Sequence, residues 1–393
     1  MKNYSKWMAD SVIERNTNLT DHWGYEYGLT LDGIIEVWRQ TGDEKYLNYA
    51  IKIMDTFVNE DGTINGYTVD EYNIDHLNNG KAVLSLYKAT KNPKYKKALD
   101  LLRSQIDTHP RTSEGVFFHK NIYPNQIWLD GLYMGATFYA KYVTELGATF
   151  YAKYVTEFGE DSAQNEKEYN DIGRQFVLAE KNLRDSKTGL LYHAYDEARI
   201  QPWANKETGL SRHFWGRSMG WFVMALVDTL EVLPEQNEYY PRLVSALNNC
   251  ISALMNVQDE ESHVWYQVLD QGHRKGNYLE ASGSSMITYA ILKGARKGYL
   301  PEEYIQKGLQ AYEGLVNEFI LETDEHLINL NKICYVAGLG GKDKRDGSYT
   351  YYISEPIISN EPKGLGPFIL AAAEAELVLN KIQKEEELVG ARA

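Results

Sequence analysis

The sequence predicts an all-α fold in which six helical hairpins close into a ring, with one helix of each pair on the inside. Two observations predict it. Apolar residues recur with helical periodicity along nearly the whole chain, and the connectors between the helical stretches repeat in two alternating forms. Hairpins that repeat in this way cover their neighbours' apolar faces, so six of them can close on themselves. An open solenoid of the same hairpins is the alternative fold.

The periodicity predicts twelve helical stretches. They cover residues 3–16, 28–41, 43–58, 75–91, 93–108, 127–158, 164–183, 211–232, 237–257, 279–298, 301–320 and 363–384. The connectors within hairpins share one form, namely a helix stop, an acidic residue or proline, and then a tyrosine. The clearest copies are residues 42–46, 92–95 and 300–304, with looser copies at 166–169 and 238–239.

The connectors between hairpins repeat as well. Each is a turn followed by a short aromatic strand that ends in a polar residue, and the copies are 113–119, 187–193 and 262–267. Their last positions hold His119, His193 and Gln267. Because each connector leads to the next inner helix, we expect these loops and the inner-helix N-termini to gather at one end of the ring, where chemistry is usually placed.

One stretch departs from the regular pattern. The eleven residues 135–145 recur without change as 147–157, a period of twelve. Twelve residues lengthen a helix by about 18 Å and rotate the segment beyond them by about 120°. We expect the second copy to extend the helix, to loop out or to reflect a recent duplication. It should lower stability but leave Asp130, which lies upstream, in place.

Length and composition indicate a single globular domain. The chain has 393 residues, of which 43% are hydrophobic and 24% are charged, so it can bury a large core. No linker-like segment marks a boundary, so we expect one domain over 1–393 with a flexible tail at about 385–393.

The sequence argues against several locations and partners. No apolar run reaches membrane-spanning length, the N-terminus lacks the apolar middle of a signal peptide, and the two cysteines do not form a disulfide framework. A cytoplasmic protein without a membrane partner is therefore expected. The net charge of −14 argues against nucleic acid, and it requires a local cationic cluster to attract any anionic substrate. We expect a monomer or a weak homo-oligomer.

The most informative stretch is 117–135, where an aromatic run leads into the start of a helix. It places His119 and Lys120 just upstream of Trp128 and Asp130. A carboxylate at a helix start, beside an indole and two nitrogen bases, suits an enzyme that acts on an acidic sugar. The plainer interpretation is a carboxylate favoured by the helix dipole.

Further candidate residues stand at or near the starts of other inner helices. Aromatic faces stack on the C–H surfaces of sugars and polar side chains bind their hydroxyl and carboxylate groups, although a tryptophan also packs anywhere in a core. The candidates are Tyr25, Asp75, His193, Trp215, Arg217 and Trp221. Asp75 and Asp130 open successive inner helices, and paired carboxylates are the usual equipment of glycoside hydrolysis. For Asp75 the plainer interpretation is a helix N-cap.

Other chemistries lack their signatures. The chain has no His-x-x-x-His pair on a helix and no cysteine cluster, so no metal is expected. It has no phosphate-binding glycine loop and no Gly-x-Ser-x-Gly nucleophile turn. We therefore expect no cofactor.

The motifs resemble those of glycoside hydrolase family 105, the unsaturated rhamnogalacturonyl hydrolases and related unsaturated glucuronyl hydrolases. The resemblance rests on the segments 118–120, 128–135, 192–197, 214–221, 279–284 and 363–368, so it spans nearly the whole chain. Trp-Leu-Asp-Gly-Leu-Tyr-Met-Gly at 128–135 is the most specific of them. The resemblance implies an (α/α)6 barrel, which agrees with the ring of six hairpins. The duplicated twelve residues depart from the family pattern.

The resemblance also implies a mechanism. The substrate is an oligosaccharide left by a polysaccharide lyase, with a 4,5-unsaturated uronic acid at its non-reducing end. Asp130 would donate a proton to C4, water would add at C5, and the hemiketal would open to release the remaining sugar. A nearby Asp75 and a dry aromatic wall would keep the proton on Asp130. His119, Lys120, His193 and Arg217 would contact the uronate, and Tyr25, Trp128, Trp215 and Trp221 would line the pocket.

Three alternatives stay open. The nearest is a hydrolase for unsaturated glucuronyl disaccharides from glycosaminoglycans or ulvan, which would use the same aspartates. A sugar epimerase on a similar ring would use histidines as acid and base and would keep its activity in an Asp130→Ala variant. A non-catalytic sugar-binding scaffold would have no need of the Asp75 and Asp130 pair.

Overall fold

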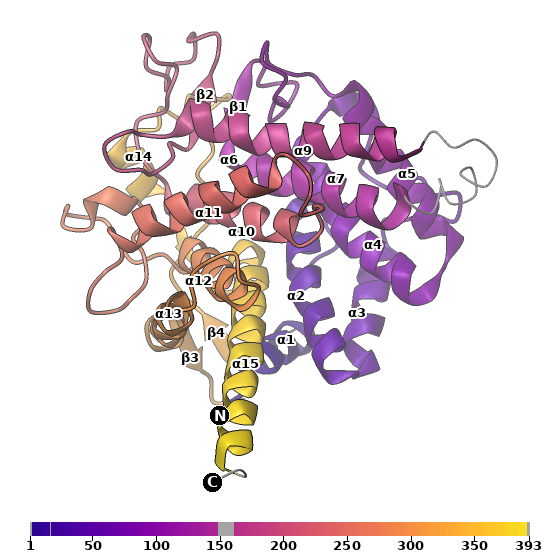
Figure 1. The fold of residues 1–393 in the computed structure, drawn as a ribbon, viewed down its shortest axis with the longest axis vertical. Coiled ribbons are helices and arrows are strands. Elements are labelled where there is room, and N and C mark those ends of the chain that lie inside the picture. The colour runs from indigo at the N-terminus through magenta and orange to yellow at the C-terminus, as the bar shows by residue number, and fades with distance from the viewer. Residues whose placement is uncertain (1, 16, 148–160, 391–393) are drawn as a thin grey trace.

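The computed structural model describes residues 2–15, 17–147 and 161–390. Its inner helices form a closed ring (Figure 1). In ring order they are α2 (Tyr25–Thr41), α4 (Asn79–Thr90), the segment from α6 (Leu129–Gly131) through η3 (Leu132–Ala136) to α7 (Thr137–Tyr142), α10 (Gly216–Leu230), α12 (Ala281–Arg296) and α15 (Pro362–Gly390). Each packs on the next, and α15 returns to pack on α2. This closure confirms the (α/α)6 barrel and excludes the open solenoid.

The outer helices alternate with the inner ones. They are α1 (Tyr4–Glu14), α3 (Glu44–Met54), α5 (Pro93–Thr108), α9 (Asp161–Leu183), α11 (Tyr240–Met255) and α13 (Tyr304–Phe319). The hairpin turns have the predicted form: Gly42 ends α2 in the left-handed region at φ 70°, and the side chain of Asp43 caps α3. The predicted ranges agree with these helices to within a few residues at most ends.

The inner helices are buried along almost their whole length. All fifteen residues of α10 are buried, and residues 281–295 of α12 are buried as well, because an inner helix packs on its neighbours from every side. Polar residues on these helices are therefore exceptional and have specific partners.

The start of the 127–158 helix is irregular in a way that the sequence does not reveal. The short α6 leads into the π-helical turn η3, and a second π-helical turn, η4 (Val143–Gly147), comes after α7. Such turns often occur near functional sites. The second copy of the duplication lies almost entirely outside the described residues, so its predicted effect stays a prediction.

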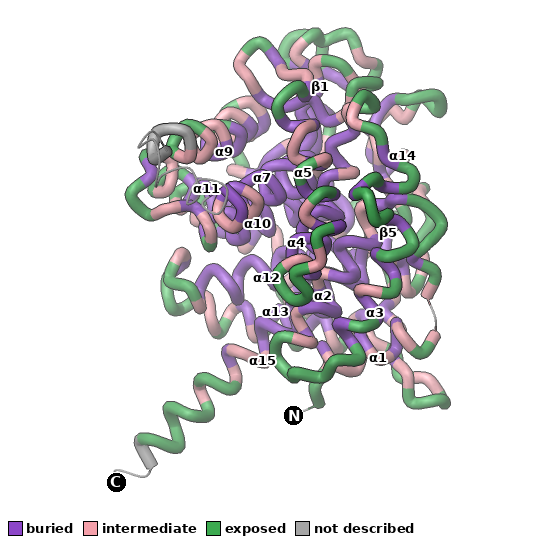
Figure 2. Tube along the Cα trace, turned by 90° about the vertical axis from the view of Figure 1, so that its right-hand side faces the viewer, coloured by how far each residue is buried: buried purple, intermediate pink, exposed green. Residues whose placement is uncertain are grey.

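The C-terminal segment, which includes the predicted flexible tail, is helical as far as Gly390. Helix α15 continues to Gly390, and its last turns project from the body of the molecule with residues 383–388 exposed (Figure 2). None of the described helices combines the length and apolar character needed to cross a membrane.

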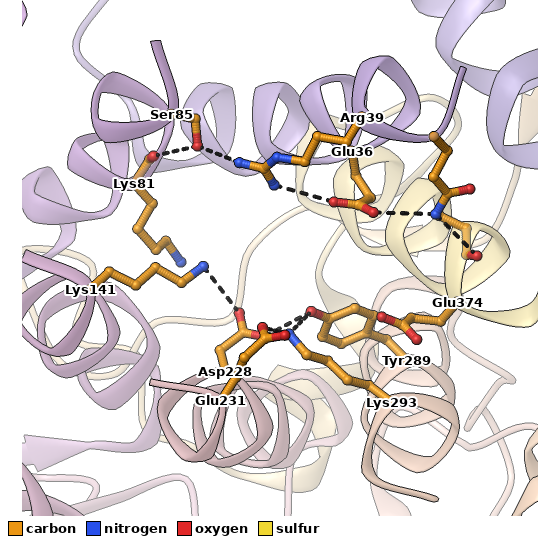
Figure 3. A network of polar contacts seen from close by, with 12 residues as sticks. Glu36, Arg39, Lys81, Ser85, Lys141, Asp228, Glu231, Tyr289, Lys293 and Glu374 are labelled. Carbon is orange, nitrogen blue, oxygen red and sulfur yellow. Dashed lines mark hydrogen bonds and ion pairs between the residues drawn. The ribbon is translucent and has the colours of Figure 1, made fainter. Parts of the chain in front are cut away.

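Charged residues from the inner helices line an enclosed cavity of about 140 Å³ toward their C-terminal halves (Figure 3). The Nζ of Lys293 lies 2.7 Å from both Asp228 and Glu231, and Arg296 binds Glu374 through two contacts of 2.7 and 2.8 Å. These ion pairs join α10, α12 and α15 at the end of the barrel away from the inner-helix N-termini.

Candidate active site

The loops between hairpins are held to the inner helices by a repeated backbone hydrogen bond. The first residue of each of three inner segments donates its N–H to the last residue of the neighbouring connector. These bonds join Ile74 to His119 (3.2 Å), Leu129 to His193 (3.2 Å) and Gly216 to Gln267 (2.9 Å). The structure thus confirms that His119, His193 and Gln267 are equivalent positions of a repeat.

The strands of this region are shorter than predicted and partly displaced. β1 (Gln126–Trp128) pairs with β2 (Ala194–Asp196), which sets Trp128 opposite Ala194. The aromatic stretches before His119 and His193 make only isolated bridges, at Phe117 and Leu191. The polar ends of the connectors are nevertheless brought to the helix starts.

The residues that follow Ile74, Leu129 and Gly216 occupy equivalent positions as well. They are Asp75, which lies in the 3₁₀ turn η2 (Ile74–Asn78) before α4, Asp130 and Arg217. The two predicted carboxylates and the predicted arginine are therefore equivalent positions of the repeat. This register explains why residues far apart in the sequence share one site.

Asp130 lies within an aromatic and imidazole cage. Its Oδ2 is 3.4 Å from Nε2 of His193, and its side chain is 14% exposed. The indole of Trp128 stacks on His119, with centroids 4.6 Å apart and planes within 8°, and it stacks on Tyr123 as well. The edge of the same indole meets the ring of His193.

Three polar atoms in this cage have no hydrogen-bond partner although they are buried. They are Nδ1 of His119, Oδ2 of Asp130 and Nε2 of His193. Buried polar groups are almost always paired, so unpaired ones that gather around one carboxyl indicate a place where a polar ligand binds.

Asp75 is neutralised by its neighbours. Nζ of Lys120 lies 2.7 Å from its Oδ2, and Nε2 of His119 lies 3.6 Å from its Oδ1. Burial raises the pKa of Asp75, but the ammonium group of Lys120, with His119 as a smaller influence, outweighs burial and holds that pKa below its usual value. Burial lowers the pKa of His119 to about 4, so its imidazole is neutral at neutral pH and Lys120 supplies the positive charge.

This pairing bears on the expectation that a nearby Asp75 would keep the proton on Asp130. A carboxylate in direct contact with an ammonium group exerts little field on a third group. Asp75 instead holds Lys120 and His119 in place beside the cage.

The guanidinium of Arg217 is largely occupied by the protein. It donates to the backbone oxygens of Cys334 (2.7 Å) and Tyr335 (3.3 Å) and to the hydroxyl of Ser282 (3.1 Å). It also lies 4.9 Å from the ring centre of Trp215 and is 1% exposed. Arg217 thus fixes the 333–335 segment at the site, a role that its residue type alone did not reveal.

The predicted aromatic residues divide between the cage and the core. Trp215 lies 4.7 Å from His193 and donates its indole N–H to Gln267. Trp221, one and a half turns further along α10, is fully buried and packs on Tyr133 and on Tyr25. Trp221 thus contacts the predicted pocket residue Tyr25, and its buried indole nitrogen has no hydrogen-bond partner, so its place in the pocket stays a prediction.

Sequence reasoning missed Tyr352, which touches the cage, as well as Tyr123, which stacks on Trp128. Tyr352 lies on the short helix α14 (Tyr349–Ser354), and its hydroxyl is 2.8 Å from Nδ1 of His193. The two residues are 159 positions apart, and α14 lies in a stretch without helical periodicity, so no sequence signal joined them.

No group of three or more histidine, cysteine, aspartate or glutamate side chains in the described part of the chain could hold a metal ion.

An (α/α)6 barrel with a carboxyl group among indoles and imidazoles at the inner-helix N-termini defines a class of carbohydrate-active enzymes, the helical-barrel glycoside hydrolases.

Comparison with known proteins gives the family. The model of Glycosyl Hydrolase Family 88 matches residues 1–379. The structure also matches a glycoside hydrolase from family 105 of C. acetobutylicum ATCC 824 with 67% identity and a TM-score of 0.89, over 96% of this chain and 100% of the other. The chain therefore belongs to the related glycoside hydrolase families 88 and 105, as its motifs predicted, and it is an enzyme of the unsaturated uronyl hydrolase type.

Two further relatives are more distant. The unsaturated rhamnogalacturonyl hydrolase YesR of Bacillus subtilis (strain 168) is 28% identical over 79% of this chain and 81% of its own length. The unsaturated glucuronyl hydrolase of Bacillus sp. GL1 is 13% identical over 92% of this chain and 86% of its own, with a TM-score of 0.62, and shares the fold.

Proposed function

We propose that the protein releases the 4,5-unsaturated uronic acid from the non-reducing end of a lyase-generated rhamnogalacturonan disaccharide. The observation that carries this proposal is the carboxyl of Asp130, whose buried Oδ2 has no hydrogen-bond partner and faces His193 within a cage of aromatic rings. The preference for a rhamnogalacturonan fragment is supported by the similarity to YesR.

In the proposed reaction, Asp130 is the acid and then the base. It transfers its proton to C4 of the enol ether while positive charge develops at C5. Water adds at C5 and gives its proton back to the Asp130 carboxylate. The hemiketal at C5 opens to a ketone, which leaves a hemiacetal at C1 that releases the remaining sugar. One water molecule is consumed, and no redox change occurs.

Lys120 is the proposed contact for the uronate carboxylate. Its ammonium group is held by Asp75 at 2.7 Å, and its side chain is 23% exposed, so part of it can reach a ligand. His119 presents an unpaired ring nitrogen, Nδ1, for the sugar or the attacking water. Trp128 and Trp215 supply apolar ring faces that exclude bulk water from the reacting carbon atoms.

The test is an ultraviolet assay with a panel of lyase-generated disaccharides. The conjugated uronate absorbs, and hydration of its double bond abolishes the signal. Fast loss of absorbance with the unsaturated rhamnogalacturonan disaccharide, and slower loss with glycosaminoglycan and ulvan disaccharides, supports the proposal. A preference for the glucuronyl substrates would instead assign the protein to the sister activity, and no loss with any member would refute both.

A further inference from the structure

The short helix α14 reaches the proposed acid through one histidine. The hydroxyl of Tyr352 lies 2.8 Å from Nδ1 of His193, and the other ring nitrogen, Nε2, lies 3.4 Å from Oδ2 of Asp130. Tyr352 and His193 are both 0% exposed. The three side chains form a continuous line from α14 to the carboxyl group, and no other contact of this kind reaches Asp130 among the described residues.

The direction of the tyrosine hydrogen bond is set by the partners available. Within the part of the chain that the structure describes, the only hydrogen-bond partner of the Tyr352 hydroxyl is Nδ1 of His193. If Nδ1 carried a proton, that proton and the hydroxyl proton would compete for one contact, and the buried hydroxyl proton would have no acceptor. The hydroxyl therefore donates to Nδ1, which leaves the imidazole proton on Nε2.

We propose that Tyr352 is a positioning residue that sets the tautomer of His193, so that its Nε2–H points at Oδ2 of Asp130. This inference rests on the proposed function of Asp130 as the acid. With the Nε2–H directed at Oδ2 from 3.4 Å, the acid proton resides on Oδ1, the oxygen left for the substrate. As that proton moves to C4, the negative charge that develops on the carboxylate is stabilised by the Nε2–H donor.

The surrounding frame holds this line in place. Gln267 donates from Nε2 to the backbone oxygen of Tyr352 at 3.0 Å, and its Oε1 accepts the indole N–H of Trp215 at 3.0 Å. The ring of Trp215 lies 4.7 Å from that of His193. Gln267, the third residue of the connector repeat, thus joins the backbone of Tyr352 to the indole of Trp215, the two residues that flank His193.

Tyr352→Phe is the direct test. It removes the hydroxyl and keeps the ring, so His193 loses the group that fixes its tautomer. We expect kcat on the preferred unsaturated disaccharide to fall by about 10- to 100-fold, as for the loss of a hydrogen bond to a charged group, with little change in KM. The basic limb of the pH–rate profile should move to higher pH, because a carboxylate without its donor holds its proton more firmly.

Tyr351→Phe is the matched control. Its hydroxyl donates to the backbone oxygen of Gly338 at 2.7 Å, so the variant loses one hydroxyl from the same helix without touching His193. Activity and pH profile should stay near those of the wild type. An equal loss in both variants would show that α14 acts only through stability and would overturn the proposal.

Nitrogen NMR of histidine-labelled protein gives a readout that is independent of turnover. The His193 signals, assigned through a His193→Gln variant, should show a protonated Nε2 in the wild type and a changed tautomer in Tyr352→Phe. A protonated Nδ1 in the wild type would refute the tautomer assignment even if the enzyme is active. If the wild type hydrolyses none of the disaccharides but shows the Nε2 tautomer, the proposed function fails while the positioning by Tyr352 stands.

Discussion

The Lys120→Met substitution tests how the two carboxylates of the site divide their roles. It removes the ammonium group that lies 2.7 Å from Asp75 and leaves that buried carboxylate without its main counter-charge. Methionine keeps most of the side-chain volume, so the effect reports charge more than packing.

The expected loss of stability follows from the geometry of the pair of Lys120 and Asp75. At 2.7 Å and an effective dielectric constant of about 20, the attraction is about 6 kcal/mol before desolvation is subtracted. Removal of one partner from a buried pair usually costs about 3–5 kcal/mol, and the lower end applies because Lys120 is 23% exposed. We therefore expect Lys120→Met to lower the free energy of unfolding by about 3 kcal/mol at neutral pH.

The pH dependence has a defined sign. The pKa of Asp75 is lower in the folded protein than its usual value, so its contribution to stability is complete above the unfolded pKa of 3.8 and is lost as the pH falls through the folded value. The difference between wild type and Lys120→Met should shrink at low pH, because the variant protonates Asp75 and removes the unpaired charge.

Urea unfolding followed by tryptophan fluorescence measures this difference, and Asp75→Asn with the double variant completes a double-mutant cycle. The double variant should lose less stability than the sum of the two single variants. The basic limb of the pH–rate profile should be nearly unchanged in Asp75→Asn but should move to higher pH in Lys120→Met, where Asp75 becomes an uncompensated charge. A Lys120→Met protein as stable as the wild type, or a large shift of the limb in Asp75→Asn, would refute the neutralised pair.

The structure predicts the outcome of four further substitutions, one of which is a control. In Asp130→Asn, kcat/KM should fall by a factor of about 10²–10⁴, while the circular dichroism spectrum and the melting temperature stay near those of the wild type. An active variant would favour epimerase-like chemistry based on histidines. Lys293→Met should cost about 3–5 kcal/mol in urea unfolding, because it leaves Asp228 and Glu231 buried and unpaired. Lys81→Met, its control, should cost less, since Nζ of Lys81 has no hydrogen-bond partner, its ion pair with Asp32 is long at 4.0 Å, and burial lowers its pKa to about 7; equal costs would contradict the ion-pair assignment. Gly135→Ala should lower the free energy of unfolding by about 1–3 kcal/mol, because an added Cβ would lie 2.5 Å from the side chain of Ile74. An unchanged melting temperature would show that the helices can move apart.

The barrel was predictable because its signals are local or repeat. Helical periodicity and hairpin connectors such as Gly42 with Asp43 mark the helix ends, and the repeat of His119, His193 and Gln267 predicts which loops are equivalent. The π-helical turns around Thr137–Tyr142 were not predictable, because they depend on how this segment packs against its neighbours.

The site was predictable in its members but not in its pairings. Asp130, His119, His193 and Trp128 come together as expected, since each stands at an inner-helix start or at the end of a connector.

The contacts that assign roles depend on tertiary distances that one sequence does not contain. The ion pair of Asp75 with Lys120, the bonds of Arg217 to the 333–335 segment and the approach of Tyr352 to His193 are of this kind.

The most direct measurement is the hydrolysis of the unsaturated disaccharide in deuterated water, with absorbance and reducing sugar monitored together and the product examined by NMR. Protonation of C4 by Asp130 predicts that absorbance disappears at the rate at which reducing sugar appears, and that deuterium enters one face of C4. Release of reducing sugar ahead of the loss of absorbance, with deuterium distributed over both faces of C4, would mean that the anomeric bond is attacked first and would contradict the assignment of Asp130.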